Sequence, residues 1–516
     1  MKDFARLIER IAFTPSRNAK LTLLQDYLAR TADPDRGWAM AALTGALELR
    51  NISRSFLQGL MTERVDPILF ALSYDFVGDL AETISLIWPT TAPSEEVSLS
   101  EAVQLLQLSG RARGGRELAA MLDRLTPSER LAFLKLGTGN MRIGLSARMV
   151  QLALAQMGSR QIEEIEEIWH GLVPPYQGLF DWLAGGAPPA LALSAPFRPV
   201  MLSTAVTLEE LDGYRPEDYH AEWKWDGIRV QVVSEAGERR LYSRTGEEIS
   251  GSFPEIIEAM QFDGVLDGEL LVKRGPEVAP FADLQRRLGR KTVSAAQLKS
   301  HPAAIRVYDL LLWQGEDLRA LPLSERRARL EQIDFGSERF DLSPLLSFQT
   351  WEDIARLRDT PPDPVIEGVM LKQKTSAYLA GRPRGPWFKW KRAPRNVDAV
   401  LLYAQSGHGK RSGFYSDFTF GLWEGGELLP VGKAYFGFTD AELRELDRFV
   451  RKNTTQRFGP VRQVKPLLVL EVAFDGVNVS ARHKSGVAMR FPRISRIRWD
   501  KPAAEADQLS TLKAML

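Results

Sequence analysis

The sequence of 516 residues contains no cysteine and only five histidines. The absence of cysteine excludes disulfides, thiol nucleophiles, iron–sulfur clusters and zinc sites built on thiolates. None of the histidines stands in an HxH or HExxH spacing, so we expect no zinc and no other transition-metal site. A catalytic metal, if one is used, is expected to be a hard cation held by carboxylates and phosphates.

Long apolar runs and an excess of charge are also missing. No run of about 18 uncharged apolar residues occurs, so we expect no membrane span. The opening residues, MKDFARLIERIAF, lack the apolar core of a signal peptide, and we expect a cytoplasmic protein. The 67 basic and 66 acidic residues leave a net charge of +1, which gives no indication of a nucleic-acid partner. A chain of this length predicts about three domains.

Charge is nevertheless distributed unevenly. Between Lys372 and Arg411 basic residues far outnumber acidic ones, and Trp387, Phe388 and Trp390 stand among them. A run of charge is usually a solvated face. Interleaved aromatic residues suit contact with phosphates and bases better than plain solvation.

Residues 1–185 have a helical pattern. Apolar residues at positions 4, 7, 8 and 11 share one helix face. The segment TPSE at residues 126–129 is typical of a helix start, with Gly137 as the expected end, and Ser146 is a second expected N-cap. The glycine-rich loop between these helices could hold a phosphate through its amides and Arg142, although such a loop alone is more often a turn.

The segment GGAPP at residues 185–189 is the best candidate linker. After it, short β-type runs at residues 230–233, 265–272, 305–312 and 365–371 alternate with helical stretches. Strand-like runs at residues 397–403, 418–423 and 467–474 follow, separated by glycines as in a small β-barrel. We predict a multi-domain α+β protein with an all-helical domain at residues 1–190, an α/β domain at 196–393 and a β-barrel at 394–516.

The segment EWKWDGIR at residues 222–229 carries the most chemical information. Lys224 stands between two tryptophans, and burial of an amine favours its neutral, nucleophilic form. The Asp-Gly pair that follows predicts a tight turn that lets the backbone approach a ligand. Arg229 offers a forked donor for phosphate or ribose oxygens. A KxDG match alone could also arise by chance in a strand and turn that have only a structural role.

This segment resembles motif I, KxDGxR, of the nucleotidyl-transferase superfamily of ATP-dependent DNA ligases, RNA ligases and mRNA-capping enzymes. The segment YSRTG at residues 242–246 looks like the arginine motif that follows motif I. The remaining likenesses are LDGEL (266–270) to motif III, VYDLL (307–311) to motif IIIa, EGVMLK (367–372) to motif IV, WFKWK (387–391) to motif V and RFPRISRIRWDK (490–501) to motif VI of DNA ligases. Residues 134–145 are similar to the DNA-binding domain of the larger ligases. The whole chain resembles the three-domain ATP-dependent DNA ligases of bacteria and archaea.

The resemblance implies a helical DNA-binding domain, an ATP-grasp-like adenylation (nucleotidyl-transferase) domain and an OB-fold domain over the three ranges given above. It implies an enzyme that uses ATP and Mg²⁺, with Mn²⁺ as the alternative ion, to seal nicks in duplex DNA. A lysyl-AMP on Lys224 and a DNA-adenylate are the implied intermediates, and repair, replication or recombination the implied setting. We expect a monomer that acts at the nucleoid. The sequence does not reveal which proteins it binds.

The resemblance also assigns roles around the nucleotide. Lys224 attacks the α-phosphate, Glu222 accepts from the amine of adenine, and Tyr308 stacks on the base. Glu222 could instead be a surface charge beside a strand, and Tyr308 a core residue whose hydroxyl has no named partner. The complete ATP-binding set implied is Glu222, Arg229, Arg244, Glu269, Tyr308, Arg384, Lys389 and Lys391.

Carboxylates and cations are expected around the phosphates. Glu269 and Glu367 are the candidate ligands of Mg²⁺, with a structural salt bridge as the alternative for each. Lys389 and Lys391 alternate with Trp390, so on a strand both ammonium groups face one side, the implied α-phosphate site. Arg244 fits the same pocket or the 5′-phosphate of a nick.

An arginine is expected shortly before motif V. Arg382 and Arg384 both stand there, and Arg384, which is followed by glycine, is the better match.

In the barrel, the resemblance places Arg490, Arg493, Asp500 and Lys501 opposite the pyrophosphate during the reaction with ATP. The arginine cluster could alternatively serve only to bind DNA. A domain that serves one step has to move away for the others, so we expect rotation about residues 391–397.

Other functions fit less well. An RNA ligase or a capping-type nucleotidyltransferase is the first alternative, but neither usually carries a helical DNA-binding domain. An NAD-dependent DNA ligase carries a cysteine zinc module and lacks motif VI. A non-catalytic DNA-binding protein would not need the full set of lysines and glutamates named above.

Overall fold

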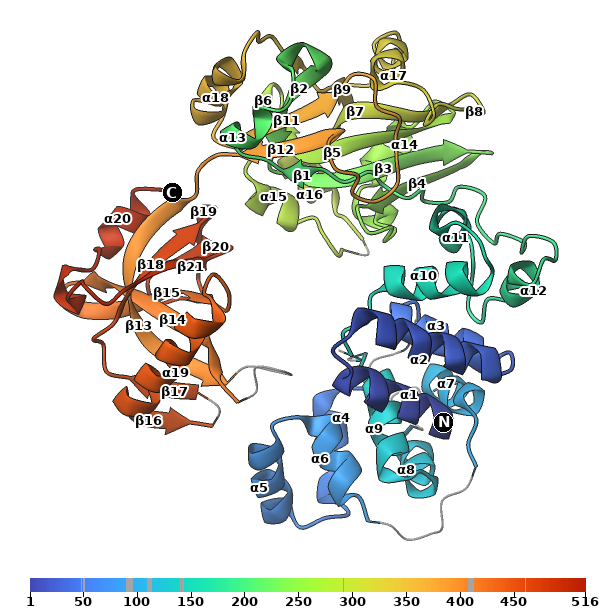
Figure 1. Cartoon of the computed structure of the whole chain (residues 1–516), viewed down its shortest axis with the longest axis vertical. Coiled ribbons are helices and arrows are strands. Elements are labelled where there is room, and N and C mark those ends of the chain that lie inside the picture. Colours follow the sequence, from blue (N-terminus) through green and yellow to red (C-terminus); the bar gives the residue numbers. More distant parts are fainter. Residues whose placement is uncertain are drawn as a thin grey trace. The chain divides into compact units, whose positions relative to one another are not determined.

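The computed structural model describes the chain except for residues 48, 50, 51, 90–95, 109–113, 140, 142, 291, 407–412 and 460. Arg142 and Arg411, which belong to the loop and the basic run discussed above, lie outside the described residues. The chain divides into two compact units, Met1–Lys391 and Arg392–Leu516, coloured blue to orange and orange to red in Figure 1. The predicted domain boundaries remain predictions, although the division between the units lies next to the one expected at residue 393.

Every regular element described between residues 2 and 183 is a helix. Their apolar faces share one core that runs from Met1 to Leu183. The helices are α1 (Lys2–Phe13), α2 (Arg17–Arg30), α3 (Asp35–Thr44), α4 (Arg54–Thr62), α5 (Pro67–Val77), α6 (Leu80–Ile87), α7 (Leu99–Leu108), α8 (Gly114–Arg124), α9 (Pro127–Gly137), α10 (Ala147–Met157), α11 (Ile162–Trp169) and α12 (Leu179–Leu183).

The helix boundaries predicted from capping residues are confirmed. The backbone N–H of Thr126 donates to the Glu129 carboxylate at 2.9 Å, and α9 begins at the proline between them. Gly137 is the last residue of α9. The Ser146 hydroxyl accepts from the backbone N–H of Met149 at 3.3 Å at the start of α10. These side chains satisfy amide groups that a helix start leaves unpaired.

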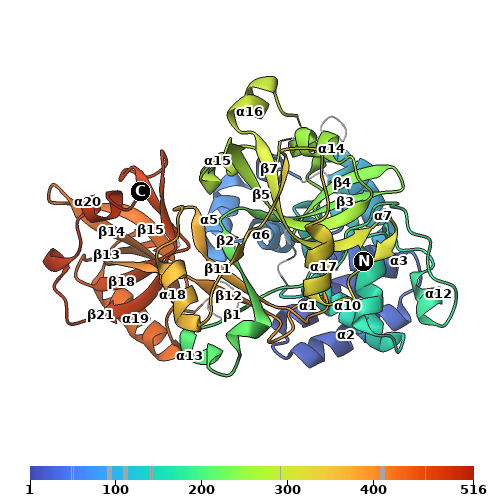
Figure 2. The same cartoon turned by 90° about the horizontal axis from the view of Figure 1, so that it is seen from above.

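Two sheets follow within the first unit. One has the strand order β1-β12-β11-β2-β10, and the other has β4-β3-β5-β7-β8, with β6 beside β5 and β9 beside β7. Figure 2 shows the long antiparallel pair β5 and β7 side by side. The strands are β1 (Thr204–Ala205), β2 (Tyr219–Trp225), β3 (Ile228–Glu235), β4 (Glu238–Ser243), β5 (Gly264–Arg274), β6 (Glu277–Val278), β7 (Ala303–Trp313), β8 (Glu316–Asp317), β9 (Phe340–Leu342), β10 (Leu345–Leu346), β11 (Ile366–Gln373) and β12 (Trp387–Lys391).

Short helices cover these sheets, and each sheet has its own apolar core. The predicted β-type runs are confirmed as parts of β3, β5, β7 and β11. Since β2 and β3 belong to different sheets, the turn between them links the two layers. The helices are α13 (Leu208–Leu211), η1 (Pro216–Asp218), η2 (Ser250–Ser252), α14 (Pro254–Ala259), α15 (Phe281–Gln285), α16 (Ala295–Ser300), α17 (Leu323–Leu330) and α18 (Trp351–Asp359).

The second unit is a β-barrel-like fold around one core. Its sheet has the order β15-β14-β13-β17-β16, and β18 pairs with both β13 and β21, while β19 and β20 form a separate hairpin. The strand-like runs predicted here lie in β13, β14 and β18. The elements are β13 (Arg395–Ser406), β14 (Tyr415–Glu424), β15 (Glu427–Ala434), α19 (Asp440–Asn453), β16 (Thr454–Phe458), β17 (Val461–Val464), β18 (Val469–Phe474), β19 (Gly476–Val479), β20 (Val487–Arg490), β21 (Arg493–Arg498), η4 (Ala503–Glu505) and α20 (Leu509–Lys513).

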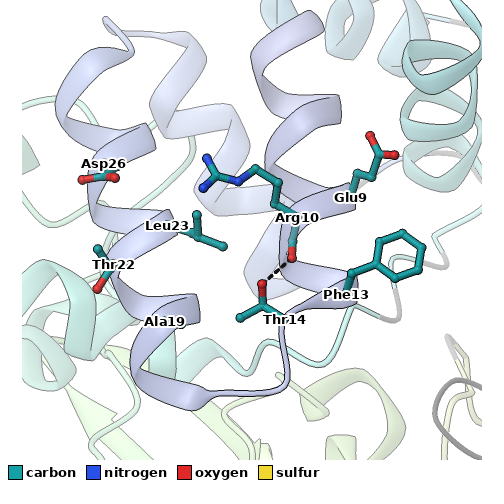
Figure 3. A pocket seen from close by; sticks show the side chains of 8 residues that line it. All are labelled: Glu9, Arg10, Phe13, Thr14, Ala19, Thr22, Leu23 and Asp26. Atoms are coloured by element: carbon teal, nitrogen blue, oxygen red, sulfur yellow. Dashed lines mark hydrogen bonds between the residues drawn. The ribbon is translucent and has the colours of Figure 1, made fainter.

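A surface hollow lies between α1 and α2 (Figure 3). At its edge the Thr14 hydroxyl donates to the Arg10 carbonyl at 2.7 Å. All of its lining residues come from these two helices and the turn between them, so the hollow is separate from the residues expected to carry chemistry.

Candidate active site

Lys224 lies next to the end of β2, just before the turn that crosses to β3. The backbone N–H of Asp226 in this turn donates to the Val365 carbonyl at 3.0 Å. A Cβ on Gly227 would lie 2.5 Å from the Leu270 carbonyl oxygen, closer than real Cβ atoms come. The close approach of β5 therefore requires glycine at this position, and the predicted approach of a ligand to this turn stays a prediction.

Glu367 brings two of the predicted lysines together. Its Oε2 atom lies 2.5 Å from Lys224 Nζ and 3.6 Å from Lys391 Nζ. Gly368 on β11 stands opposite Lys224 on β2 and opposite Lys391 on β12, and the register of β11 with β2 shifts between Ile366 and Gly368. Glu367 is the extra residue at this β-bulge, which interrupts the regular alternation of side chains and lets the carboxylate turn toward the lysines. The Lys224 and Glu367 side chains are only 23% and 17% exposed, so solvent screens their attraction only partly.

Glu269 on β5 is a second carboxylate at this place, opposite Arg229 on β3. Its pKa is raised to about 8, mainly by burial and to a smaller extent by Glu367, against the opposite effect of Lys224 and Arg229. A pair of carboxylates among lysines suits a divalent cation that takes its remaining ligands from water and phosphate. The donor set thus fits Mg²⁺.

The fork of Arg229 binds the protein itself. Its Nε and Nη2 atoms donate to the two oxygens of Asp267 at 3.0 and 2.6 Å, and Nη1 donates to the Met201 carbonyl at 2.6 Å. Asp267 also accepts from the hydroxyls of Tyr378 and Tyr308, at 2.6 and 2.9 Å. The Asp267 carboxylate raises the pKa of Arg229 well above its usual value against the effect of burial. A guanidinium bound in this way orients the site more readily than it reaches a phosphate.

Tyr308, Glu222 and Lys372 form a neighbouring cluster. Lys372 is almost fully buried and donates to Glu222 Oε1 at 2.8 Å. Its ammonium lies 4.2 Å from the centre of the Tyr308 ring and 4.8 Å from that of Trp387. A buried carboxylate beside aromatic rings is the arrangement that a nucleobase with an amino group requires. Glu222 is therefore not a surface charge, and the Tyr308 hydroxyl has Asp267 as its partner.

Lys389 lies among further cations. Burial lowers the pKa of its ammonium, and then Arg382, Lys224, Lys391 and Arg244 lower it further, in that order. Such a collection of positive charge suits the phosphates of a nucleotide. Of the two candidate arginines, Arg382 is thus the one whose charge reaches Lys389.

Arg384, which the glycine after it favoured, is not among the leading charges that act on Lys389, although both arginines are exposed.

The motif VI residues belong to the second unit, where ion pairs hold them. Arg493 lies 3.0 Å from Asp475. Lys501 lies 2.8 Å from Asp398, which also pairs with Arg498 at 3.2 Å. Asp500 lies 2.9 Å from Arg498, and this hydrogen-bonded guanidinium lowers the pKa of Asp500 to about 2. Arg490, at the end of β20, has its guanidinium over the Phe491 ring.

Comparison with known proteins decides the family. Three family models match the chain. They are described as "DNA ligase N terminus" over residues 1–155, "ATP dependent DNA ligase domain" over 200–391 and "ATP dependent DNA ligase C terminal region" over 411–501. A relative named "Probable DNA ligase" from Koribacter versatilis is 34% identical over 99% of this chain and 95% of its own. The chain belongs to the ATP-dependent DNA ligase family.

Further similarities agree with this. The protein named "DNA ligase 1" of Korarchaeum cryptofilum is 29% identical over 99% of this ligase and 97% of that relative. A solved structure titled "Pmar-Lig_PreS3" covers 96% of this ligase and 99% of its own chain with a TM-score of 0.62 at 16% identity, which shows a shared fold. The predicted fold class of helical, nucleotidyl-transferase and OB-like parts is confirmed, and the ligase is an enzyme that uses ATP. The RNA-ligase and capping alternatives receive no such support.

Several residues of this ligase site were not assigned a role from the sequence. Asp267 and Lys372 lie inside motifs III and IV, so their place in these motifs could have marked them as site residues. Asp398 was visible only as the single acidic residue in a basic run. Tyr378 had no signal, because its place beside Asp267 depends on the path of the loop between β11 and β12.

Within the part of the ligase that the structure describes, no helix is both long and apolar enough to cross a membrane. Among the same residues, no group of three or more His, Cys, Asp or Glu side chains could hold a metal by itself.

Proposed function

We propose that this ligase seals nicks in duplex DNA through a covalent lysyl-AMP on Lys224. The observation that carries the proposal is the pairing of Lys224 with Glu367 beside Glu269, in the same pocket as the lysines of β12. The Lys224 amine attacks the α-phosphorus of ATP, a P–N bond forms, and pyrophosphate leaves. The AMP then passes to the 5′-phosphate of the nick, and attack by the 3′-hydroxyl releases AMP and closes the strand.

The Lys224 ammonium has to lose a proton before it can attack. The Glu367 oxygen at 2.5 Å is within reach to accept it. Glu367 then both orients the amine and holds the proton.

Adenine is proposed to bind at the cluster of Glu222, Lys372 and Tyr308. The Glu222 carboxylate accepts from the amino group of the base, while the hydrogen bond from Lys372 holds the carboxylate in place. The Tyr308 ring stacks on the base, and its hydrogen bond to Asp267 fixes the plane of the ring. A buried hydrogen-bonding site rejects bases that leave its groups unpaired.

The α-phosphate is proposed to lie between Lys389 and Lys391. Arg382 and Arg244 add charge on the same side, and Arg384 is the weaker candidate. These cations neutralise charge that develops during phosphoryl transfer. Glu269 and Glu367 would hold Mg²⁺, or Mn²⁺, which supplies further positive charge to the phosphates when it is bound.

The motif VI residues Arg490, Arg493, Asp500 and Lys501 are proposed to act on the pyrophosphate in the first step only. The second unit would then rotate about residues 391–397, where β12 ends and β13 begins. We further propose that the ligase is a monomer in the cytoplasm that acts at the nucleoid in repair, replication or recombination.

Covalent labelling tests this function. The protein is incubated with Mg²⁺ and ATP labelled at the α-phosphate, denatured, and digested to locate the label by mass spectrometry. We expect label on Lys224 with ATP and none with GTP, no label in Lys224→Ala, and none in Lys224→Arg, because a guanidinium stays protonated. Lys484→Ala, a lysine outside the motifs, serves as the matched control and keeps full labelling. Label at another residue in Lys224→Ala would contradict the assignment.

A further inference from the structure

His170 directly follows α11, yet its ring binds the adenylation region. The Nε2 atom lies 2.9 Å from the Gly246 carbonyl oxygen, and Nδ1 accepts from the backbone N–H of Phe197 at 3.1 Å. A carbonyl can only accept and an amide N–H can only donate, so Nε2 carries the proton and Nδ1 does not. The ring is neutral, with a single tautomer, and bridges two backbone segments.

Aromatic rings surround the imidazole. The Tyr242 ring lies edge-on at 4.7 Å and the Phe197 ring at 5.6 Å from its centre, and the Tyr242 hydroxyl donates to the Ala195 carbonyl at 2.7 Å. Gly246 has a φ of +83°, and a Cβ there would lie 3.1 Å from Phe197 and 3.3 Å from His170. Burial lowers the pKa of His170, which favours the neutral ring that this geometry requires.

The Gly246 carbonyl belongs to the turn that carries Arg244. The Ser243 N–H donates to the Glu247 carbonyl at 2.8 Å, and the Gly246 N–H donates back to the Ser243 carbonyl at 2.9 Å. Arg244 is one of the exposed residues of this turn, and its charge reaches Lys389 in the proposed phosphate site. His170 thus binds the carbonyl of Gly246, which stands two positions after Arg244, a cation of the proposed phosphate site.

A second contact attaches the same segment. Arg319, next to β8, binds both oxygens of Glu167 at 2.8 and 2.9 Å. Glu167 lies in α11, three residues before His170, so one short stretch meets the adenylation region at two separate points. Only the His170 contact involves the turn of Arg244.

We propose that His170 is a positioning residue of the ligation reaction: it fixes the turn at residues 243–247 so that Arg244 faces the phosphate site. The helical third of the chain would then supply a residue needed for chemistry as well as for binding DNA. This inference depends on the proposed role of Arg244.

The test uses full-length variants and two single-turnover reactions, self-adenylation with ATP and sealing of a nick that already carries AMP. His170→Ala should slow the same step as Arg244→Ala, by roughly ten- to hundredfold, since misplacement of a group by about 1 Å has effects of this size. His170→Gln keeps an N–H donor for Gly246 and should recover most of the rate. His170→Asn has a shorter side chain, whose amide can take the place of Nδ1 as acceptor for Phe197 but does not reach the Gly246 carbonyl, and it should not recover the rate.

A double-mutant cycle separates positioning from a general loss of structure. The rate of the His170→Ala/Arg244→Ala double variant should lie within about twofold of Arg244→Ala alone, because a residue that acts through Arg244 has no effect without it. Glu167→Gln loosens the other docking contact and should leave both rates near wild type.

Three results would overturn the inference: a wild-type rate in His170→Ala, additive losses in the cycle, or an equal loss in Glu167→Gln. Equal recovery by His170→Asn would also assign the effect to the Phe197 contact and overturn it. If Arg244→Ala itself ligates at the wild-type rate, the proposed role of Arg244 fails together with this inference. If Arg244→Ala is impaired and His170→Ala is not, only this inference fails.

Discussion

Glu269 stands opposite Arg229 in the pairing of β3 with β5, and burial raises the pKa of its carboxyl to about 8 from the ordinary value of 4.5. Between these two pH values the folded protein keeps a proton that the unfolded chain has lost. Raising the pH therefore favours the unfolded chain, and this part of the stability is present at low pH and lost as the pH rises through the folded pKa.

The variant Glu269→Gln cannot titrate at this position. We expect it to be more stable than the wild type at pH 8 by roughly 1–3 kcal/mol, and to differ little at pH 4.5 to 5. Urea unfolding at several pH values, without divalent cations, measures the difference. A stability difference that does not change with pH would show that Glu269 is ionised in the folded protein. The same variant should lose ligation, because an amide is a poor substitute for a carboxylate that binds Mg²⁺.

Arg382 and Arg384 form a natural matched pair, separated by one proline. Arg382 is the leading charge among those that lower the pKa of Lys389. We expect Arg382→Ala to slow self-adenylation by about tenfold or more and Arg384→Ala by less than about threefold, as one charge-assisted contact contributes about 1.5–3 kcal/mol. Quenched-flow labelling with ATP gives both rates. A larger loss in Arg384→Ala would restore the assignment that the glycine after Arg384 favoured.

The residues that the sequence predicted well are those whose chemistry is local. Lys224, Glu222 and Glu367 stand in short motifs, and the likeness of these motifs to those of the nucleotidyl-transferase superfamily was enough to group them. Arg229 was predicted to reach a ligand, but its fork binds Asp267, and the partner lies on another strand. Pairing between strands is set by register, which a single sequence does not contain.

At the scale of elements, β13 connects the start of the second unit to its motif VI residues. Asp398 on this strand is largely buried and pairs with both Arg498 and Lys501. Removal of a buried carboxylate leaves two cations without their partner.

Asp398→Asn should therefore destabilise the second unit by about 2–4 kcal/mol, somewhat less than breaking a fully buried ion pair, because Arg498 and Lys501 are partly exposed. The control is Glu424→Gln, which removes an exposed ion pair with Lys513 in the same unit and should change stability by less than about 1 kcal/mol. Calorimetry of the full chain measures both variants. Equal effects would show that the Asp398 cluster is no more than a surface ion pair.

Elements were predicted more fully than contacts. The caps of α9 and α10 and the main strands follow from local patterns, and the structure has them at or near the expected residues. The edge strands β1 and β10 have two residues each, which is too short for a detectable alternation of apolar and polar residues. Contacts of α11 with the adenylation region were also not predicted, because they join residues far apart in the sequence.

At the scale of the whole molecule, the division of the chain after Lys391 separates residues proposed for more than one step from residues proposed for the reaction with ATP alone. Lys224, Glu269 and Glu367 lie in the first unit, and the motif VI residues lie in the second. Pyrophosphate leaves only during the reaction with ATP, so groups that orient it are needed only then. Sealing of a nick that already carries AMP requires the 3′-hydroxyl, the carboxylates and a bound duplex instead.

The Asp500→Ala/Lys501→Ala variant should therefore react with ATP at least about a hundredfold more slowly, which corresponds to about 3 kcal/mol of transition-state stabilisation. It should seal a pre-adenylated nick within about threefold of the wild-type rate. Because Lys501 also pairs with Asp398, the Asp398→Asn variant serves as the control for a loss of local structure. If the double variant slows both steps by the same factor, and the control does so too, these residues stabilise the barrel or bind DNA. Rotation of the second unit between steps would then have no support from motif VI.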